Sequence, residues 1–198
     1  MIFGQFVKFK KRIINEKLRV ILESKEQQAQ PGESQVLHHA ASGTIKDFHA
    51  LSHFGTAVAA RTRAAFNGAG TAYSVRLKLG NVVHIPHDSG EHSHEEITDA
   101  LLKHNHISKE EQTNLHNSYK DKNYNDKTKI LSKHLISKGI NTVSYKNEME
   151  DDGSTSYIIT HPSQVRILKH GTKINYDRHK TPDGIPDEEK WWNDPDFK

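Results

Sequence analysis

No cysteine occurs among the 198 residues. This absence excludes a disulfide framework and any zinc site built on thiolate ligands, and it fits a reducing compartment. The chain also lacks an apolar run that approaches the roughly 20 residues a membrane-spanning helix needs. Its N-terminus has no uninterrupted apolar segment of the kind found in signal peptides, so we expect no cleaved leader. We therefore expect a soluble protein without a membrane span.

The chain has little excess of charge of either sign. Its 28 Lys and Arg residues face 25 Asp and Glu residues, for a net charge of +3 with neutral histidines. Because the basic residues are spread along the sequence, they permit a nucleic-acid groove without requiring one. With 33% hydrophobic residues, the length suffices for one domain with a hydrophobic core and polar extensions.

The composition divides the chain into four parts. Residues 1–24 gather apolar side chains near one helical face and basic ones largely elsewhere. This pattern predicts a basic amphipathic helix that packs on the domain or docks on a membrane or a partner. Residues 25–35 are polar and contain Pro-Gly, as linkers do. We expect a domain over residues 36–170 and a polar, mostly irregular tail over residues 171–198.

The first half of the predicted domain contains strand patterns. The stretch "LHHAA" favours a strand, and Thr56 is a suitable N-cap for a helix over "AVAARTRAAF". In "AYSVRLKL" the apolar residues Tyr73, Val75 and Leu77 alternate with polar ones, which predicts a half-buried strand. The stretch "NVVHI" is expected to continue this strand or to pair with it.

Three helices and three strands are expected to follow. Ser93 is a candidate N-cap, and Ser108 with Glu111 forms a capping-box pattern. Asp126 is expected to open a further helix that ends at Gly139. The stretches "INTVSYK", "TSYIITH" and "QVRIL" read as short strands. Strands first, helices next and strands last indicate an α+β fold.

Four stretches carry side chains suited to chemistry: "LHHAA", "LSHFGT", "YKNEMED" and "STSYIITHPSQVRIL". Each alone has an ordinary explanation, as a strand histidine, a helix N-cap or a solvated acidic turn. Their order resembles the ADP-ribosyltransferase superfamily, with the diphtheria-toxin and mono-ADP-ribosyltransferase fold, and most closely its bacterial and phage toxin-like branch. The late run resembles the family's Tyr-x-Asn-x-x-Glu, Gly-Ser, Ser-Tyr-Ile and Pro-x-Gln pattern. The resemblance covers about residues 36–168.

This resemblance implies a split β-sheet with helices inserted between the early and late strands. It implies an enzyme that uses NAD as a substrate, as a mono-ADP-ribosyltransferase of the glycosyltransferase class or as an NAD glycohydrolase. The acceptor would be a macromolecule, with a protein favoured over a nucleic acid and both left open. The setting would be a toxin or effector, made in a bacterial cytoplasm, delivered into a host or competitor cell, and met there by a host or immunity protein. An inactive NAD-binding or interaction domain is also consistent, because the family's Gly-Thr after the first histidine is Ala40-Ala41 here.

The resemblance also assigns roles to individual residues. Glu150 would be the catalytic glutamate, which stabilises positive charge on the ribose as nicotinamide leaves. On an extended strand Glu148 would face the same side, where it would activate the acceptor. His39 would contact the ribose next to the nicotinamide, with His38 as the alternative because the phase of the strand is open. Backbone groups of Ala40 would hold the carboxamide.

Further residues are expected around the same NAD pocket. Three residues of the second motif would line it: Ser52, His53 and Phe54. Phe54 or Tyr73 could stack on the nicotinamide ring. Arg61 and Arg63 on the following helix could meet the pyrophosphate charge, or they could lie on a solvent-exposed helix face.

A metal site is the competing interpretation, because the chain holds 15 histidines. The stretch "HIPHDSGEHSHEE" offers five possible ligands: His84, His87, Asp88, His92 and His94. Imidazole and carboxylate ligands at such spacing suit a divalent ion in a hydrolase or nuclease. The order is not the His-Glu-x-x-His of zinc peptidases, and we favour exposed loop histidines as the explanation of the stretch. We therefore expect no metal ligand in the site.

Overall fold

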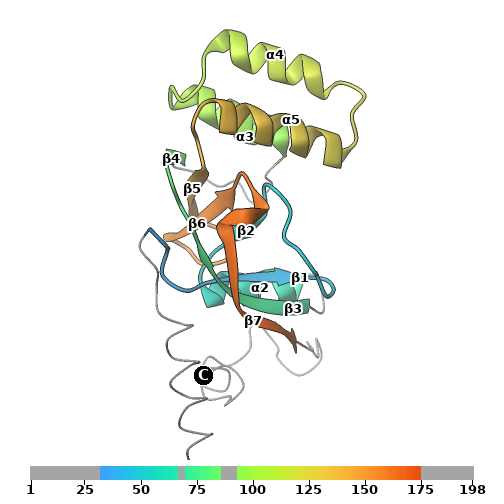
Figure 1. The fold of residues 1–198 in the computed structure, drawn as a ribbon, viewed down its shortest axis with the longest axis vertical. Coiled ribbons are helices and arrows are strands. Elements are labelled where there is room, and N and C mark those ends of the chain that lie inside the picture. Colours follow the sequence, from blue (N-terminus) through green and yellow to red (C-terminus); the bar gives the residue numbers. More distant parts are fainter. Residues whose placement is uncertain (1–31, 67–69, 86–92, 175–198) are drawn as a thin grey trace, which may run out of the picture.

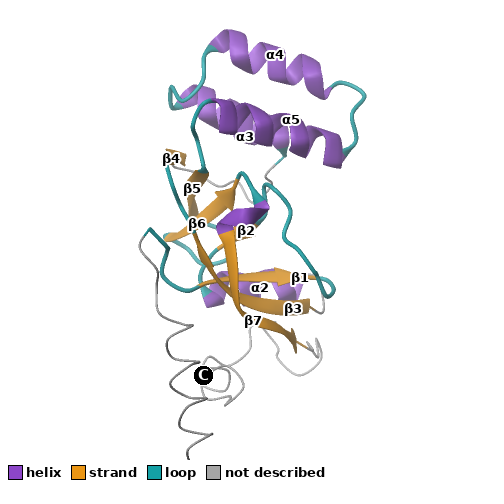
Figure 2. Ribbon diagram, in the orientation of Figure 1, coloured by secondary structure: helices purple, strands orange, loops and turns teal. Residues whose placement is uncertain are grey.

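The computed structural model describes residues 32–66, 70–85 and 93–174. The predicted N-terminal helix, residues 25–31 of the predicted linker and most of the predicted tail lie outside the described residues. The described part has two β-sheets, with helix α2 beside one and helices α3, α4 and α5 grouped beside the other (Figures 1 and 2). The predicted α+β class is confirmed.

The first sheet has three antiparallel strands in the order β1-β3-β7. Their bounds are Leu37–Ala41 for β1, Gly70–Leu77 for β3 and Val165–Ile174 for β7. The predicted alternation in β3 is confirmed, since Tyr73, Val75 and Leu77 are buried while Ser74 and Arg76 are only partly so. Helix α2, Ala57–Phe66, covers the other face through small residues at Ala40, Ala60, Ala64 and Ala72.

The second sheet has four strands in the order β2-β6-β5-β4. Their bounds are His53–Phe54 for β2, Ser154–Ile159 for β6, Thr142–Asn147 for β5 and Val82–Ile85 for β4. The expectation that "NVVHI" continues or pairs with β3 is wrong, because β4 pairs in parallel with β5. Gly80 turns the chain with a φ of 59°. Asn81 N–H then donates to Asn141 Oδ1 at 2.9 Å, and its side chain donates to the Gly139 carbonyl at 3.0 Å, which seats β4 beside β5.

Three helices pack on this second sheet: α3, His94–Lys103; α4, Lys109–Tyr119; and α5, Tyr124–Ser137. Their apolar faces share one core with β4, β5 and β6. The capping boxes at Ser93 and Ser108 are present. Helix α5 begins two residues before the predicted Asp126, because the Asn123 side chain accepts the Asp126 N–H at 3.0 Å. None of the described helices is long and apolar enough to cross a bilayer.

Ordered pairing extends past both predicted bounds of the domain. Strand β7 continues to Ile174, where it pairs with Gly70. At the other end, Glu33 forms a bridge with Lys78. The Glu33 carboxylate also accepts two hydrogen bonds from Arg166, at 2.8 and 2.6 Å. Because this fork is bidentate, it fixes the start of the domain on β7.

The two sheets meet along β2 and then part. His38 and Gly55 exchange backbone hydrogen bonds of 2.8 and 3.0 Å, which attaches the end of β2 to β1. His53 and Phe54 pair instead with Ile158 and Tyr157 of β6. A β-carbon at Gly55 would stand 2.7 Å from Ser156 Oγ, so only glycine allows this approach.

The buried side chain of Gln164 ties the two sheets together at their other end. Its Oε1 accepts the His161 N–H at 2.9 Å and the Thr160 N–H at 3.1 Å. Its Nε2 donates to the Lys78 carbonyl at 3.0 Å and to Thr142 Oγ1 at 3.1 Å. One amide therefore joins the ends of β3 and β6 to the start of β5.

We predict that Gln164→Ala lowers the free energy of unfolding by about 2 kcal/mol, because buried backbone groups lose their partners. Urea denaturation followed by far-UV circular dichroism measures this loss. The matched control is Ser163→Ala, an exposed neighbour, whose effect should stay within about 0.5 kcal/mol. Equal effects of the two substitutions would contradict a linking role for Gln164.

Candidate functional site

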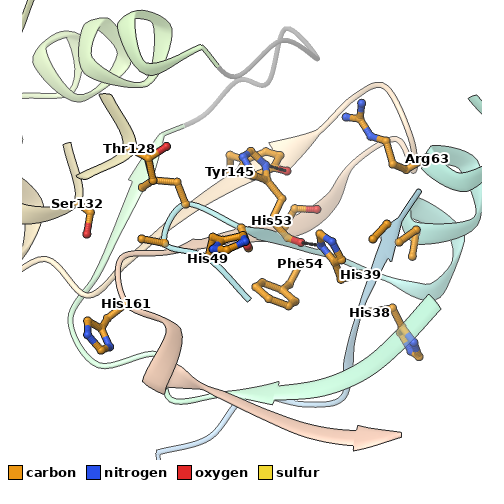
Figure 3. A pocket seen from close by; sticks show the side chains of 18 of the residues that line it. His38, His39, His49, His53, Phe54, Arg63, Thr128, Ser132, Tyr145 and His161 are labelled. Carbon is orange, nitrogen blue, oxygen red and sulfur yellow. Dashed lines mark hydrogen bonds between the residues drawn. The ribbon is translucent and has the colours of Figure 1, made fainter. Parts of the chain in front are cut away.

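An open cleft of about 970 Å³ is lined by β1, the segment that leads into β2, helices α2 and α5, and the β5–β6 turn (Figure 3). Its size lies at the upper end of the range for small-molecule sites. The cleft brings together most of the predicted site residues: His38, His39, Ala40, Ser52, His53, Phe54 and Glu150. Tyr73 and Glu148 are not among its lining residues.

The structure settles which histidine of β1 faces the aromatic core beside the cleft. The His39 ring lies 5.2 Å from that of Phe48 and 5.4 Å from that of Phe54. The His38 ring points away from these rings (Figure 3), and its Nδ1 shares a 3.3 Å hydrogen bond with Ser74 Oγ. His39 is thus the better placed of the two for a role in the cleft.

His39 has a defined protonation pattern. Its Nδ1 lies 2.7 Å from the His53 carbonyl oxygen. Because a carbonyl only accepts hydrogen bonds, Nδ1 carries the proton. Burial lowers the pKa of His39, against the opposing effect of this hydrogen bond, while the charges of Arg63 and Glu150 act in opposite directions. A neutral ring with its proton on Nδ1 leaves Nε2 as an acceptor.

The backbone of Ala40 faces the gap between the parting strands. Because successive residues of an antiparallel strand turn their N–H and C=O groups to opposite edges, Ala40 points these groups to the same edge as His38. His38 finds Gly55 there. Opposite Ala40, the His53 carbonyl has turned to the His39 ring instead. A peptide donor and acceptor of β1 therefore face the cleft, while the Ala40 side chain packs on α2.

The second motif lies at the entry of β2. Leu51 holds a φ of 63°, a left-handed conformation that costs a non-glycine residue free energy. Ser52 follows Leu51, and its carbonyl accepts the Ile159 N–H at 3.2 Å. His53 Nδ1 shares a 3.0 Å hydrogen bond with the Tyr145 hydroxyl. Tyr145 also lines the cleft, and the sequence analysis did not predict it as a site residue.

The predicted stacking role of Phe54 and Tyr73 is wrong for this conformation. Both side chains are only 1% exposed and belong to the core of the first sheet. The Tyr73 hydroxyl accepts the Ile45 N–H at 2.8 Å. Neither ring has a face on which a ligand could stack.

The predicted extended Glu-x-Glu pair is also wrong, since β5 ends at Asn147 and a turn follows. The buried Asn147 side chain builds this turn. Its Oδ1 accepts the N–H groups of Met149 and Glu150 at 3.2 and 2.9 Å. Its Nδ2 donates to Glu150 Oε2 at 3.0 Å. Glu150 consequently lines the cleft, whereas Glu148 is exposed outside it.

Two contacts anchor the acidic turn on helix α2. Glu150 Oε1 forms an ion pair with Arg63 Nε. Thr56 Oγ1 donates to Asp151 Oδ2 and accepts the Ala59 N–H at 3.1 Å, which makes Thr56 the N-cap that the sequence predicted. The carboxylates of the turn are thus bound to the start and the flank of one helix.

Helix α5 forms a wall of the cleft that the sequence analysis did not anticipate. It contributes Tyr124, Thr128, Lys129, Ser132, Lys133 and Ile136. Lys129 and Lys133 are four residues apart and share one helical face. Together with Arg63 they place three cationic side chains in a cleft that holds one carboxylate, Glu150. Arg61 is buried and does not line the cleft. Of the two arginines predicted to contact phosphate, Arg63 is therefore the one in a suitable position.

The metal interpretation gains no support from the residues that are described. His84 Nδ1 shares a 3.2 Å hydrogen bond with Ser144 Oγ. His94 is buried, and its Nε2 shares a 2.8 Å hydrogen bond with Thr128 Oγ1. Within residues 32–66, 70–85 and 93–174, no three His, Asp or Glu side chains are grouped to hold an ion. The other three residues of that stretch, His87, Asp88 and His92, lie outside the described residues.

Comparisons of the chain with protein-family models, with curated proteins and with solved structures found no match. What the cleft does is therefore inferred from its own geometry and from the order of the motifs that line it.

We predict that Asn147→Ala lowers the free energy of unfolding by about 2 kcal/mol, because two turn N–H groups and one Glu150 oxygen lose their partner. Urea denaturation measures the loss. Asn117→Ala, an exposed substitution on α4, is the matched control and should change stability by less than about 0.5 kcal/mol. A loss no larger than in the control would contradict the role given to Asn147.

Stability should also fall as the pH decreases from about 7 to 5. Burial lowers the pKa values of His38, His39 and His94 in the folded state, whereas an unfolded histidine titrates near 6.5. The unfolded chain therefore binds more protons in this window, and protonation favours unfolding. His94→Gln should make the pH dependence of the urea midpoint shallower, and an unchanged dependence would contradict this account.

Proposed function

We propose that this protein cleaves NAD at the bond between nicotinamide and ribose and transfers ADP-ribose to a macromolecular acceptor. One observation carries the proposal. The Glu150 carboxylate lines the same cleft as His39 and Ala40, near enough for its charge to affect the pKa of His39. An acid, a neutral imidazole and a strand edge that lines the cleft are groups that this chemistry can use.

The arrangement of the strands is compatible with the split sheet that the motif pattern implies. The three-stranded and four-stranded sheets separate at β2, and the candidate residues gather there. Helices α3, α4 and α5 lie in sequence between the early strands β1 to β4 and the late strands β5 to β7. This order supports assigning the mono-ADP-ribosyltransferase fold.

The edge of β1 that lines the cleft suits the nicotinamide end of NAD. A carboxamide offers an N–H donor and a C=O acceptor, and the Ala40 peptide groups supply one of each in return. His39 Nε2 would accept a hydrogen bond from a ribose hydroxyl. Because burial keeps the His39 ring neutral, it does not repel the cationic nicotinamide ring.

The chemical step would break the bond between C1′ of the ribose and the nicotinamide nitrogen. The bonding electrons stay on that nitrogen, so nicotinamide leaves as a neutral molecule. Positive charge develops on the ribose, and Glu150, which accepts a hydrogen bond from a ribose hydroxyl, stabilises it. The nucleophile of the acceptor, or water in simple hydrolysis, then bonds to C1′ and loses a proton. That proton passes to solvent, because Glu148, the predicted base, lies outside the cleft.

An acceptor of protein rather than nucleic acid, and a toxin or effector setting, follow from the resemblance alone and stay predictions. An NAD hydrolase and an inactive NAD-binding domain are the alternatives that the experiment must separate. Each differs from a transferase in a product that can be measured directly.

Glu150→Gln should reduce nicotinamide release from NAD by about 100-fold or more, because the stabilising charge is removed while the shape is kept. The measurement is chromatography of released nicotinamide, with and without cell lysate, together with mass spectrometry of modified macromolecules. A mass gain on an acceptor indicates a transferase, and release without a gain indicates a hydrolase.

Asp152→Asn is the matched control, since it removes an exposed carboxylate from the same turn. It should leave nicotinamide release unchanged. Thermal unfolding of both variants checks that the fold is kept. Absence of nicotinamide release by the wild-type protein, or full release by Glu150→Gln, would overturn the proposed function.

A further inference from the structure

The two oxygens of the Glu150 carboxylate are held in different ways. Oε2 accepts a hydrogen bond of 3.0 Å from Asn147 Nδ2. Oε1 meets Arg63 Nε as an ion pair, but no hydrogen bond of good direction reaches it from the described residues. One oxygen is therefore tied to the turn, and the other is compensated by the charge of Arg63.

The Arg63 side chain has room to move, and other contacts also hold the turn. Its side chain is 46% exposed, whereas that of Glu150 is 12% exposed. Because Glu150 is little exposed, losing Arg63 leaves its charge without compensation at Oε1, a cost that the ligand must offset. The turn itself is fixed from the opposite side by Asn147, whose Nδ2 also donates to Ser156 Oγ at 3.2 Å, and by the Thr56–Asp151 hydrogen bond.

A phosphate group is the ligand that would draw Arg63 away. The guanidinium fork binds phosphate oxygens with two parallel hydrogen bonds, which a poorly directed contact with one carboxylate oxygen does not offer. Arg63 lies on the cleft wall, and Lys129 and Lys133 add positive charge to the same cleft. A dinucleotide carries two phosphate charges that these side chains can meet.

We propose that Arg63 masks Glu150 in the free protein and binds the pyrophosphate of the substrate. This inference rests on the proposed NAD cleavage and adds a residue that couples binding to it. When the pyrophosphate takes Arg63, Glu150 Oε1 is left to accept the ribose hydroxyl. The carboxylate is then compensated at this oxygen only by the substrate on which positive charge develops.

Binding of ADP-ribose, which is NAD without its nicotinamide and carries both phosphates, tests this exchange without requiring turnover. Isothermal titration should show Arg63→Met weakening the affinity about tenfold or more, because a charged hydrogen-bonded contact is lost. Arg63→Lys should lie between this variant and the wild type. Glu150→Gln should tighten binding severalfold, because Arg63 no longer has to leave a carboxylate. Lys46→Met, an exposed cation outside the cleft, should change nothing.

A second readout uses nicotinamide riboside, which has no phosphate. Arg63→Met should lower nicotinamide release from NAD and raise it from nicotinamide riboside, because Glu150 is unmasked from the start. A residue that only held the turn in place would lower both.

Equal weakening of ADP-ribose binding by Arg63→Met and Glu150→Gln, or no effect of either, would overturn the exchange, as would no ADP-ribose binding by the wild type. If the exchange is overturned in any of these ways but nicotinamide release still depends on Glu150, the proposed function is retained. Opposite shifts in affinity without any nicotinamide release would support the exchange and overturn NAD cleavage.

Discussion

The cleft depends on the place at which β2 leaves β1. Gly55 and His38 exchange two backbone hydrogen bonds, yet His53, two residues earlier, is paired with Ile158 of the other sheet. Two strands that diverge this abruptly leave backbone groups without partners, and such groups must be satisfied. The His53 carbonyl is satisfied by the His39 ring, whereas the Ala40 groups face the gap. The candidate site thus arises from an interrupted ladder of hydrogen bonds.

The same junction also controls the position of the acid. Ser156 lies so close to Gly55 that no side chain fits between them, and its hydroxyl accepts a hydrogen bond from Asn147. Asn147 in turn holds both the backbone and one carboxylate oxygen of Glu150. A carboxylate with little exposure needs such partners, because burying its charge is otherwise costly. The parting of the strands and the placement of Glu150 are therefore linked through one serine and one asparagine.

Local patterns in the sequence predicted the elements well. The capping boxes at Ser93 and Ser108 and the alternation in β3 depend on residues near in sequence, and the structure has them as expected. The parallel pairing of β4 with β5 joins residues about 60 positions apart, so no local pattern contains it. The Glu148–Glu150 spacing suggested a strand, but hydrogen bonds of the Asn147 side chain decided for a turn. Phe54 and Tyr73 were predicted to stack on a ligand, but both side chains belong to the hydrophobic core. The α5 wall depends on how a whole helix packs, which its own sequence does not specify.

The cleft contains both a carboxylate and cationic side chains, which suits a ligand that carries both positive and negative charge. Burial keeps the His39 ring neutral. The negative charge of Glu150 in this cleft is therefore not accompanied by a positive charge on His39. Positive charge is supplied instead by Arg63 on α2 (Figure 3) and by Lys129 and Lys133 of α5. The proposed substrate has a cationic nicotinamide ring at one end and an anionic pyrophosphate further along. A protonated His39 would oppose the first of these groups and weaken the stabilisation that Glu150 offers. The lowered pKa of this histidine therefore suits the proposed chemistry, and it accompanies the packing of the ring against Phe48 and Phe54.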